Sequence, residues 1–141
     1  MIQVSCGTAK PVGNVPNRSA FGKMKNKEEE ILQTACITWF DYQYPHLSKL
    51  LFAVPNGGSR HKIEAKNLKK QGVRSGVSDL VFLYPGRVYP FICLECKIKS
   101  GTQQQSQKLF EKDIKERTSG NYYIFRSFEE FKEIIEDHLY Y

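Results

Sequence analysis

The sequence predicts a mixed α/β fold in which helices flank a central sheet. Apolar, strand-like segments alternate along the chain with segments whose apolar residues recur at helical spacing. Two of the strands, VSDLVFL at 77–83 and FICLECK at 91–97, are joined only by a short turn rich in Pro. With 141 residues, 40% of them hydrophobic, the chain is long enough to bury a core as one domain.

The first part of the chain is expected to divide at about residue 25. Residues 1–25 are rich in Gly, Pro, Asn and Lys without periodicity, so we expect a loose basic arm there, followed by a single domain over 26–141. A helix is expected to begin at Asn26 and to end before Pro45. It is predicted by apolar residues that cluster on one side at helical spacing, namely Ile31, Leu32, Ala35, Cys36, Trp39 and Phe40.

The remaining elements follow from local signals. The expected elements are a strand at 50–54, a basic helix at 60–72 closed by Gly72, the strands 77–83 and 91–97, a helix at 104–117, a strand at 121–125 and a helix at 128–139. Ser127, with Glu130 three residues later, forms a capping box for the final helix. The order is therefore helix, strand, helix, hairpin, helix, strand, helix.

Composition narrows the function classes. The chain has 21 Lys and Arg against 15 Asp and Glu, a formal charge of +6, which favours a polyanionic partner such as nucleic acid. No segment approaches the length of an apolar membrane span, and the first residues have no apolar core of signal-peptide length, so we expect no membrane association. A cytoplasmic protein is expected, in the bacterial host cell if the gene belongs to a phage.

The cysteines do not predict a zinc or redox site. Cys93 and Cys96 form a C-x-x-C, but residues three apart on a strand point to opposite faces, and no second pair completes a zinc site. We expect all four cysteines to be reduced, and most of them to pack as buried thiols.

Three charges in the two apolar strands require an explanation, because a buried strand excludes ionised side chains unless something compensates them. If the turn spans Pro85 to Tyr89, Asp79 lies directly opposite Glu95, with β-carbons about 5 Å apart. Lys97, two residues beyond Glu95, projects from the same face.

Two interpretations fit this cluster about equally well from hairpin geometry alone. It is either a structural ion-pair cluster or a site for a divalent cation, with carboxylate oxygens suited to Mg²⁺ or Mn²⁺. The first helix favours the metal site. Glu29 shares its stripe with Gln33, Cys36 and Phe40 and can point over the sheet, whereas Glu28 and Glu30 are expected to stabilise the helix N-terminus.

A basic surface is predicted around the second helix. The segment NGGSR at a strand-to-helix junction permits close approach to a phosphate, although Asn-Gly is also a common turn. We expect a DNA-backbone surface made by Asn56, Gly57, Gly58, Ser59, Arg60, Lys62, Lys66, Lys69, Lys70 and Arg74.

Five short motifs follow one another along the chain: NGGSR (56–60), A-x-x-L-K (65–69), GVRSGVSDL (72–80), LECK (94–97) and G-x-x-x-x-x-QK (101–108). In carrying them in this order, the chain from Lys27 to the C-terminus resembles the VRR-Nuc family in its short, stand-alone, phage-type form. The resemblance implies a restriction-endonuclease-like (PD-(D/E)xK) core and Mg²⁺- or Mn²⁺-dependent hydrolysis of DNA phosphodiesters. The main departure is Ser78, where the family usually has a proline that stiffens the approach to the strand.

The resemblance also assigns roles to individual residues. Its metal-binding acids fall on Asp79 and Glu95 and its helix-one acid on Glu29, while the backbone carbonyl of Cys96 would complete the metal site. The catalytic lysine falls on Lys97. The motif glutamine falls on Gln107, with Gln105 as the next candidate because the run QQQSQ leaves its register open.

The expected function is a metal-dependent, structure-specific DNA endonuclease, with Holliday-junction resolution by a homodimer as the activity that the resemblance favours. The alternative is a non-catalytic DNA-binding module that retains the nuclease fold. A degenerate copy would usually have lost one of Asp79, Glu95 and Lys97, and all three are present.

Overall fold

The computed structural model describes residues 18–55 and 62–141, with side chains described from Asn26 onward except in the gap and at Lys62. The elements, in chain order, are α1 (Arg18–Gln43), the 3₁₀ helix η1 (Pro45–Leu50), β1 (Leu51–Ala53), α2 (Lys62–Lys70), β2 (Leu80–Phe82), β3 (Ile92–Cys96), α3 (Gln105–Arg117), β4 (Asn121–Phe125) and α4 (Phe128–Tyr140).

The four strands form one mixed sheet in the order β1-β2-β3-β4. The first three strands are antiparallel neighbours, whereas β3 and β4 run parallel and are connected through α3. In the central hairpin, Leu80 pairs with Leu94 and Val81 pairs with Cys93. This is the register that the sequence predicts.

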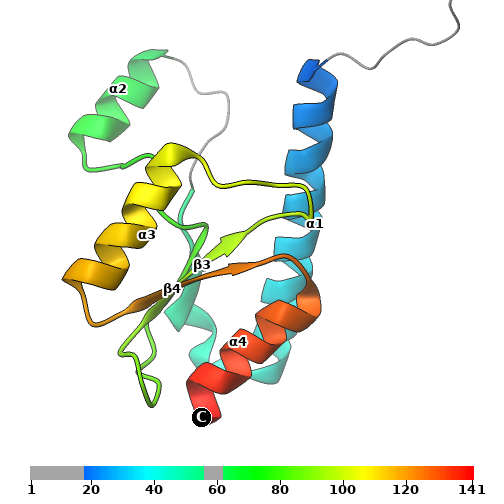
Figure 1. The fold of residues 1–141 in the computed structure, drawn as a ribbon, viewed down its shortest axis with the longest axis vertical. Helices are drawn as coiled ribbons and strands as arrows, with labels where there is room; N and C mark the ends of the chain where they lie inside the picture. The colour runs from blue at the N-terminus through cyan, green and yellow to red at the C-terminus, as the bar shows by residue number, and fades with distance from the viewer. Residues whose placement is uncertain (1–17, 56–61) are drawn as a thin grey trace, which may run out of the picture.

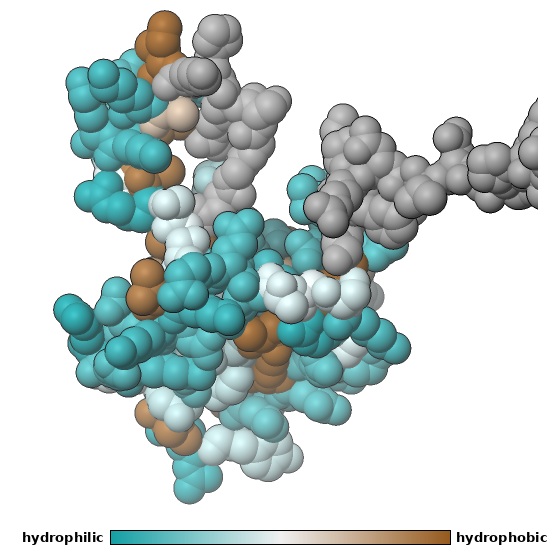
Figure 2. All heavy atoms as spheres, turned by 45° about the horizontal axis from the view of Figure 1, so that its top comes forward, coloured by the Kyte–Doolittle hydropathy of each residue, from teal (hydrophilic) through white to brown (hydrophobic). Residues whose placement is uncertain are grey.

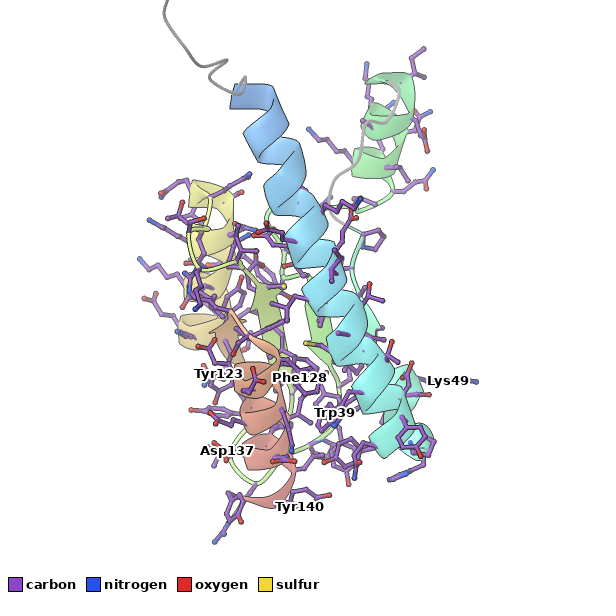
Figure 3. All side chains as sticks on the ribbon, turned by 90° about the vertical axis from the view of Figure 1, so that its right-hand side faces the viewer. Trp39, Lys49, Tyr123, Phe128, Asp137 and Tyr140 are labelled. Atoms are coloured by element: carbon purple, nitrogen blue, oxygen red, sulfur yellow. The ribbon has the colours of Figure 1, made fainter. Side chains whose placement is uncertain are left out.

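Helices cover both faces of the sheet, as Figure 1 shows. On one face, α1 and α4 enclose the larger core, where the Trp39 and Phe128 rings meet edge to face at 5.8 Å (Figure 3). On the other face, α3 covers a smaller core made by Cys93, Ile114 and Tyr122. Cys96 belongs to the larger core, so the two thiols of the C-x-x-C diverge as expected.

The predicted order of elements is confirmed, and the differences lie at their ends. Helix α1 begins at Arg18 rather than at Asn26, and the rest of the expected loose arm, residues 1–17, lies outside the described residues. Strands β2 and β3 are shorter than the apolar runs. Strand β2 pairs with β1 over three residues, and β3 pairs with β4 over five. Helix α1 ends at Gln43, before Pro45 as predicted, and Pro45 is then the first residue of η1.

Helix α2 and the N-terminal half of α1 extend from the same end of the sheet (Figure 1). Most of the surface of α2 is hydrophilic (Figure 2), with isolated apolar residues such as the 70%-exposed Ile63. In the part of the chain that is described, no helix is long and apolar enough to cross a membrane.

Candidate active site

The hairpin brings two carboxylates to the point where its strands separate. Continuing the β2–β3 register by one residue from Leu80 and Leu94 places Asp79 opposite Glu95. A side-chain contact confirms this proximity, because Oδ2 of Asp79 accepts the backbone N–H of Cys96 at 2.9 Å. Glu95 lies within β3 and Asp79 directly precedes β2, and sites built on strands are held more precisely than sites on loops.

The Glu95 side chain is fully buried and is held by three donors. Its Oε1 lies 2.8 Å from the Lys97 ammonium and also accepts a hydrogen bond from Gln107, while its Oε2 accepts one from the Tyr122 hydroxyl at 2.9 Å. Burial and the charge of Asp79 nevertheless raise the pKa of Glu95 above its ordinary value. The donors therefore compensate the buried charge only in part.

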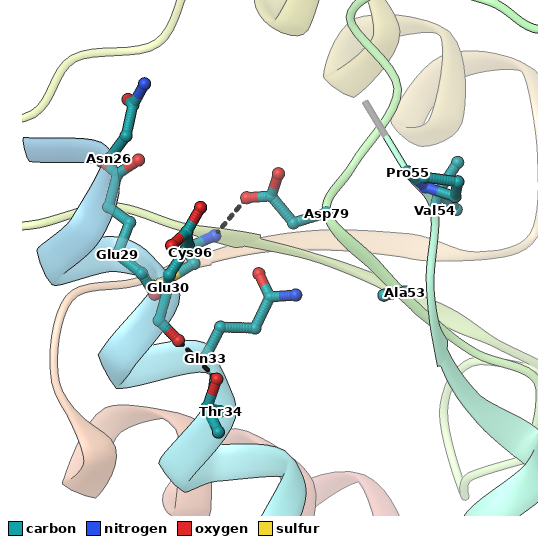
Figure 4. A pocket seen from close by; sticks show the side chains of 10 residues that line it. All are labelled: Asn26, Glu29, Glu30, Gln33, Thr34, Ala53, Val54, Pro55, Asp79 and Cys96. Carbon is teal, nitrogen blue, oxygen red and sulfur yellow. Dashed lines mark hydrogen bonds between the residues drawn. The ribbon is translucent and has the colours of Figure 1, made fainter. Parts of the chain in front are cut away.

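Asp79 lies at the edge of an open cleft (Figure 4). Its pKa is raised by burial, which outweighs the hydrogen bond from Cys96 and the charge of Lys97. The cleft has a volume of about 500 Å³ and is lined by Asn26, Glu29, Glu30, Gln33, Thr34, Ala53, Val54, Pro55, Asp79 and Cys96. It lies between α1 and the end of the hairpin, and is large enough for a phosphate group with its water.

Lys97 stays a cation despite being 8% exposed. Burial alone would lower the pKa of its ammonium, but the hydrogen bond and charge of Glu95, with Glu29 and Asp79, raise that pKa above its ordinary value. The charge arrangement accordingly favours a protonated Lys97 at neutral pH.

Glu29 reaches the site from α1. Its Oε1 accepts the backbone N–H of Ile98 at 3.4 Å, and its own carbonyl accepts a hydrogen bond from the Cys96 thiol at 3.6 Å. Glu28 and Glu30 are exposed, so Glu29 is the acid of this group that lies toward the sheet, as its place on the apolar stripe predicts. The expectation that Glu28 and Glu30 stabilise the helix N-terminus is wrong, because α1 begins at Arg18 and has no acid in its first turn.

Arg126 holds the loop that follows β3. Its Nη1 donates to the carbonyls of Ile98 and Gly101 at 2.8 Å each. A side chain at Gly101 would come within 3.2 Å of Glu29 Oε1 and 3.4 Å of the Lys97 side chain. Sequence reasoning did not identify Arg126, because the contact joins residues 28 and 25 positions apart.

Of the two candidate glutamines, Gln107 is the one that contacts Glu95. It occupies the third position of α3, where its side chain both accepts the N–H of Gln104 at 2.8 Å and donates to Glu95. Gln105 is exposed. The close approach of α3 requires a glycine at Gly76, where φ is +81° and a Cβ would lie 2.5 Å from that of Ser106.

Ser78 occupies the position before Asp79, where the resemblance leads us to expect a proline. It is fully buried, and its hydroxyl donates to the carbonyl of Leu80 at 3.0 Å. This hydrogen bond, rather than a proline ring, restrains the residue that precedes Asp79.

The donor chemistry of the site fits a hard divalent cation. When ionised, the carboxylates of Glu29, Asp79 and Glu95 and the ammonium of Lys97 sum to a formal charge of −2, and oxygen ligands suit Mg²⁺ or Mn²⁺. The raised pKa values of Asp79 and Glu95 show that this negative charge is not fully compensated within the chain. Over residues 18–55 and 62–141, however, no three Asp, Glu, His or Cys side chains are gathered closely enough to form a complete metal-binding group.

The predicted basic surface is described only in part. Asn56, Gly57, Gly58, Ser59 and Arg60 lie outside the described residues, and only the backbone of Lys62 is described, at the start of α2. The remaining members, Lys66, Lys69, Lys70 and Arg74, are exposed, and Nη1 of Arg74 donates to the Lys69 carbonyl at 3.2 Å near the end of α2.

Comparison with known proteins supports the fold. A solved structure described as a VRR_NUC domain protein is similar to this chain with a TM-score of 0.66 and 18% sequence identity, over 78% of this chain and 86% of that one. No protein-family model matches the sequence, and neither does any curated protein. The predicted α/β fold, a mixed four-stranded sheet flanked by helices, is confirmed.

Proposed function

We propose that this protein is an endodeoxyribonuclease, a phosphodiester hydrolase that depends on Mg²⁺ or Mn²⁺. The observation that carries the proposal is the pair of Asp79 and buried Glu95 beside Lys97, of which Asp79 lines the cleft between α1 and the hairpin. Two opposed carboxylates in a sheet destabilise the fold unless a cation compensates their charge. Their presence therefore favours a cation-binding site. The similarity of the fold to a VRR_NUC domain protein points to the same chemistry.

In this proposal, Asp79, Glu95, Glu29 and the backbone carbonyl of Cys96 would hold the cation, and the three carboxylates would have to draw closer together than they lie in the structure. When bound, the cation supplies Lewis-acid stabilisation of charge on a non-bridging phosphate oxygen. Gln107 and Lys97 keep Oε1 of Glu95 in place through their contacts with it. Arg126 holds the loop that lies between Lys97 and Glu29.

Lys97 acts in this scheme as a charged donor. Because the neighbouring carboxylates raise its pKa in the metal-free protein, the protonated side chain is proposed to stabilise negative charge on the phosphate or to orient the attacking water. The oxygen of that water forms the new bond to phosphorus while the bond between phosphorus and the bridging oxygen breaks. The water gives up one proton to the solvent, and the leaving oxygen takes one up from it.

The substrate is proposed to be DNA because of the charge around the cleft. The exposed cations of α2 and the residues after it stand at the same end of the sheet as the N-terminal half of α1 (Figure 1), and the whole chain carries a formal charge of +6. We extend the proposal to branched DNA, cut by a homodimer, since one chain offers one candidate site and paired incision of a junction requires two.

One observation favours the alternative of a non-catalytic DNA-binding module. Glu95 already has three hydrogen-bonding partners, so the cluster is also a satisfied ion-pair network. Both candidates predict DNA binding, and only the nuclease predicts strand cleavage that requires the acids.

The test is cleavage of a panel of end-labelled four-way junctions, flaps, nicked duplexes and linear duplexes, with and without Mn²⁺. Wild type is compared with Asp79→Asn, which removes one carboxylate, and with Asp113→Asn, a matched change on the outer surface of α3. The nuclease predicts that wild type and Asp113→Asn cut at least one substrate, whereas Asp79→Asn does not. DNA binding without cleavage in all three proteins would favour the alternative.

A further inference from the structure

A row of polar side chains runs from the outer surface of α3 to the buried Glu95. Lys115 Nζ lies 2.6 Å from Oε1 of Glu111, and Oε2 of Glu111 accepts a hydrogen bond from Nε2 of Gln103 at 2.8 Å. The Gln103 amide in turn neighbours the Tyr122 hydroxyl and acts on its pKa, and that hydroxyl donates to Oε2 of Glu95 at 2.9 Å. The row thus starts at a half-exposed lysine and ends at a fully buried carboxylate.

The donors and acceptors in this row have fixed directions. The Glu111 carboxylate can only accept, so it orients the Gln103 amide with an N–H toward it, and the second N–H of the same amide is available to the Tyr122 oxygen. A tyrosine hydroxyl has one proton. Since the Glu95 carboxylate can only accept when it is ionised, that proton is directed to its Oε2, 2.9 Å away.

The hydroxyl is not needed for packing. The Tyr122 ring belongs to the smaller core with Cys93 and Ile114, and meets the Phe110 ring at 6.2 Å. A phenylalanine would fill the same space. A buried hydroxyl costs free energy unless it is hydrogen-bonded, so its partner, Glu95, accounts for a tyrosine at this position.

We propose that Tyr122 is a positioning residue for Glu95, oriented by Gln103 and Glu111. The contact commits Oε2 of Glu95 to the interior beneath α3 and leaves Oε1 on the side of Lys97 and Gln107. The inference rests on the proposed function, in which Glu95 holds a cation. As a consequence, Glu95 would offer the cation one preoriented oxygen, Oε1. The hydrogen bond from Tyr122 that fixes the side chain reaches the other oxygen, Oε2, from the face of the sheet that α3 covers.

The experiment measures Mn²⁺ affinity directly, by the loss of the free-ion paramagnetic resonance signal, in wild type, Tyr122→Phe and Tyr123→Phe. Tyr123 is a matched control because it is the next residue of β4 and packs against the larger core on the other face. Residues that orient a metal ligand typically contribute about 10- to 100-fold to metal affinity. Tyr122→Phe is expected to bind Mn²⁺ at least ~10-fold more weakly, and Tyr123→Phe to match wild type.

Single-turnover cleavage provides a second readout. If Tyr122 acts through Glu95, raising the Mn²⁺ concentration should restore the cleavage rate of Tyr122→Phe toward that of wild type, which would not repair a merely misfolded site. Melting in EDTA establishes that each variant is folded at the assay temperature. Should Tyr122→Phe not fold, Gln103→Leu replaces it, with the same direction of change expected because Tyr122 loses the amide that neighbours its hydroxyl.

Equal Mn²⁺ affinity in wild type and Tyr122→Phe would overturn the role of Tyr122, and the wild-type cleavage result would stand unaffected. Conversely, a wild-type protein that binds Mn²⁺ but cuts no DNA would overturn the proposed function. In that case the ratio of the Mn²⁺ affinities would still decide whether Tyr122 positions Glu95.

Discussion

The Lys97 ammonium, just beyond the end of β3, lies 2.8 Å from Oε1 of Glu95 within that strand, and the two side chains are 10% and 0% exposed. This single cation faces two carboxylates, because Asp79 is opposite Glu95 across the hairpin. The ion pair therefore stabilises one acid and leaves the other undercompensated. The predictions below separate the contribution of this cluster to folding from its contribution to catalysis.

Replacing Lys97 tests whether it acts in catalysis. Lys97→Ala is expected to retain metal and DNA binding but to lose at least ~10²-fold in single-turnover rate, the usual scale for one electrostatic or proton-transfer group. Without metal it should melt earlier than wild type, because Glu95 loses its ion-pair partner, and Mg²⁺ should reduce that difference. Lys99→Ala, an exposed neighbour, is the control. A Lys97→Ala protein that cuts at nearly the wild-type rate, yet melts markedly earlier with Mg²⁺ present, would restore the purely structural interpretation.

Glu95→Gln should behave differently from Lys97→Ala. The amide keeps the shape of the side chain but loses the negative charge, so both metal affinity and cleavage should fall together. Calorimetric titration with Mn²⁺ alongside cleavage assays checks this. Unchanged Mn²⁺ affinity in a folded Glu95→Gln protein would remove Glu95 from the metal site.

The pKa of Asp79 predicts an unusual pH dependence of stability. A carboxyl whose pKa is higher in the folded than in the unfolded protein favours folding while it is protonated, and this contribution is lost as the pH rises through the folded-state pKa. In EDTA, Asp79→Asn should therefore raise the melting temperature at neutral pH. Its advantage should shrink as the pH falls through the folded-state pKa of Asp79 toward the ordinary value of 3.8.

Asp113→Asn, on the surface of α3, serves as the control for this prediction, since it removes an exposed aspartate that pairs with Arg117 at 3.2 Å. The melts would be recorded by circular dichroism at several pH values. If Asp79→Asn melts earlier than wild type at neutral pH in EDTA, the carboxylate is compensated within the chain and the argument from its desolvation is wrong.

The identity of the cation should follow from its oxygen ligands. Cleavage is expected with Mg²⁺ or Mn²⁺ only, while Ca²⁺ should support DNA binding with little cutting, because it tolerates longer and less regular coordination. Cleavage and binding would be measured on one substrate with each cation in turn. Cleavage that continues undiminished in excess EDTA would exclude the metal-dependent mechanism.

The lysines of α2 should contribute to DNA affinity without sequence preference. Each of Lys66→Ala and Lys69→Ala is expected to weaken binding and to reduce the slope of log affinity against log salt by up to about 1. Lys49→Ala is the matched control, an exposed lysine at the far end of the molecule from α2 (Figure 3). Equal losses from all three variants would indicate binding by overall charge rather than by α2.

Activity on four-way junctions should accompany a homodimer. Paired, symmetric incisions require two sites related by a two-fold axis, and each chain has one candidate site. Sedimentation with and without a junction, combined with mapping of the incisions, tests this. Strictly monomeric behaviour together with paired incisions would contradict it.

Local sequence signals determined the elements and the hairpin at the centre of the site. A five-residue turn from Pro85 to Tyr89 predicts the pairing of Leu80 with Leu94, and thereby places Asp79, Glu95 and Lys97 together. Helical spacing likewise predicts that Glu29, and not Glu28 or Glu30, lies toward the sheet. The Ser127 cap of α4, which accepts the N–H of Glu130 at 3.1 Å, also follows from sequence spacing alone.

The environment of these acids was decided only by the tertiary structure. The contact of Tyr122 with Glu95 spans 27 residues and depends on the parallel pairing of β3 with β4, which no turn between them specifies. Arg126 and Gln107 reach the site in the same way, from elements that meet only when α3 and β4 dock on the sheet. Turn length and side-chain alternation fix neighbours within a hairpin, whereas the partners of a buried charge depend on packing between distant segments, because burial and the hydrogen bonds that compensate it exist only in the assembled core.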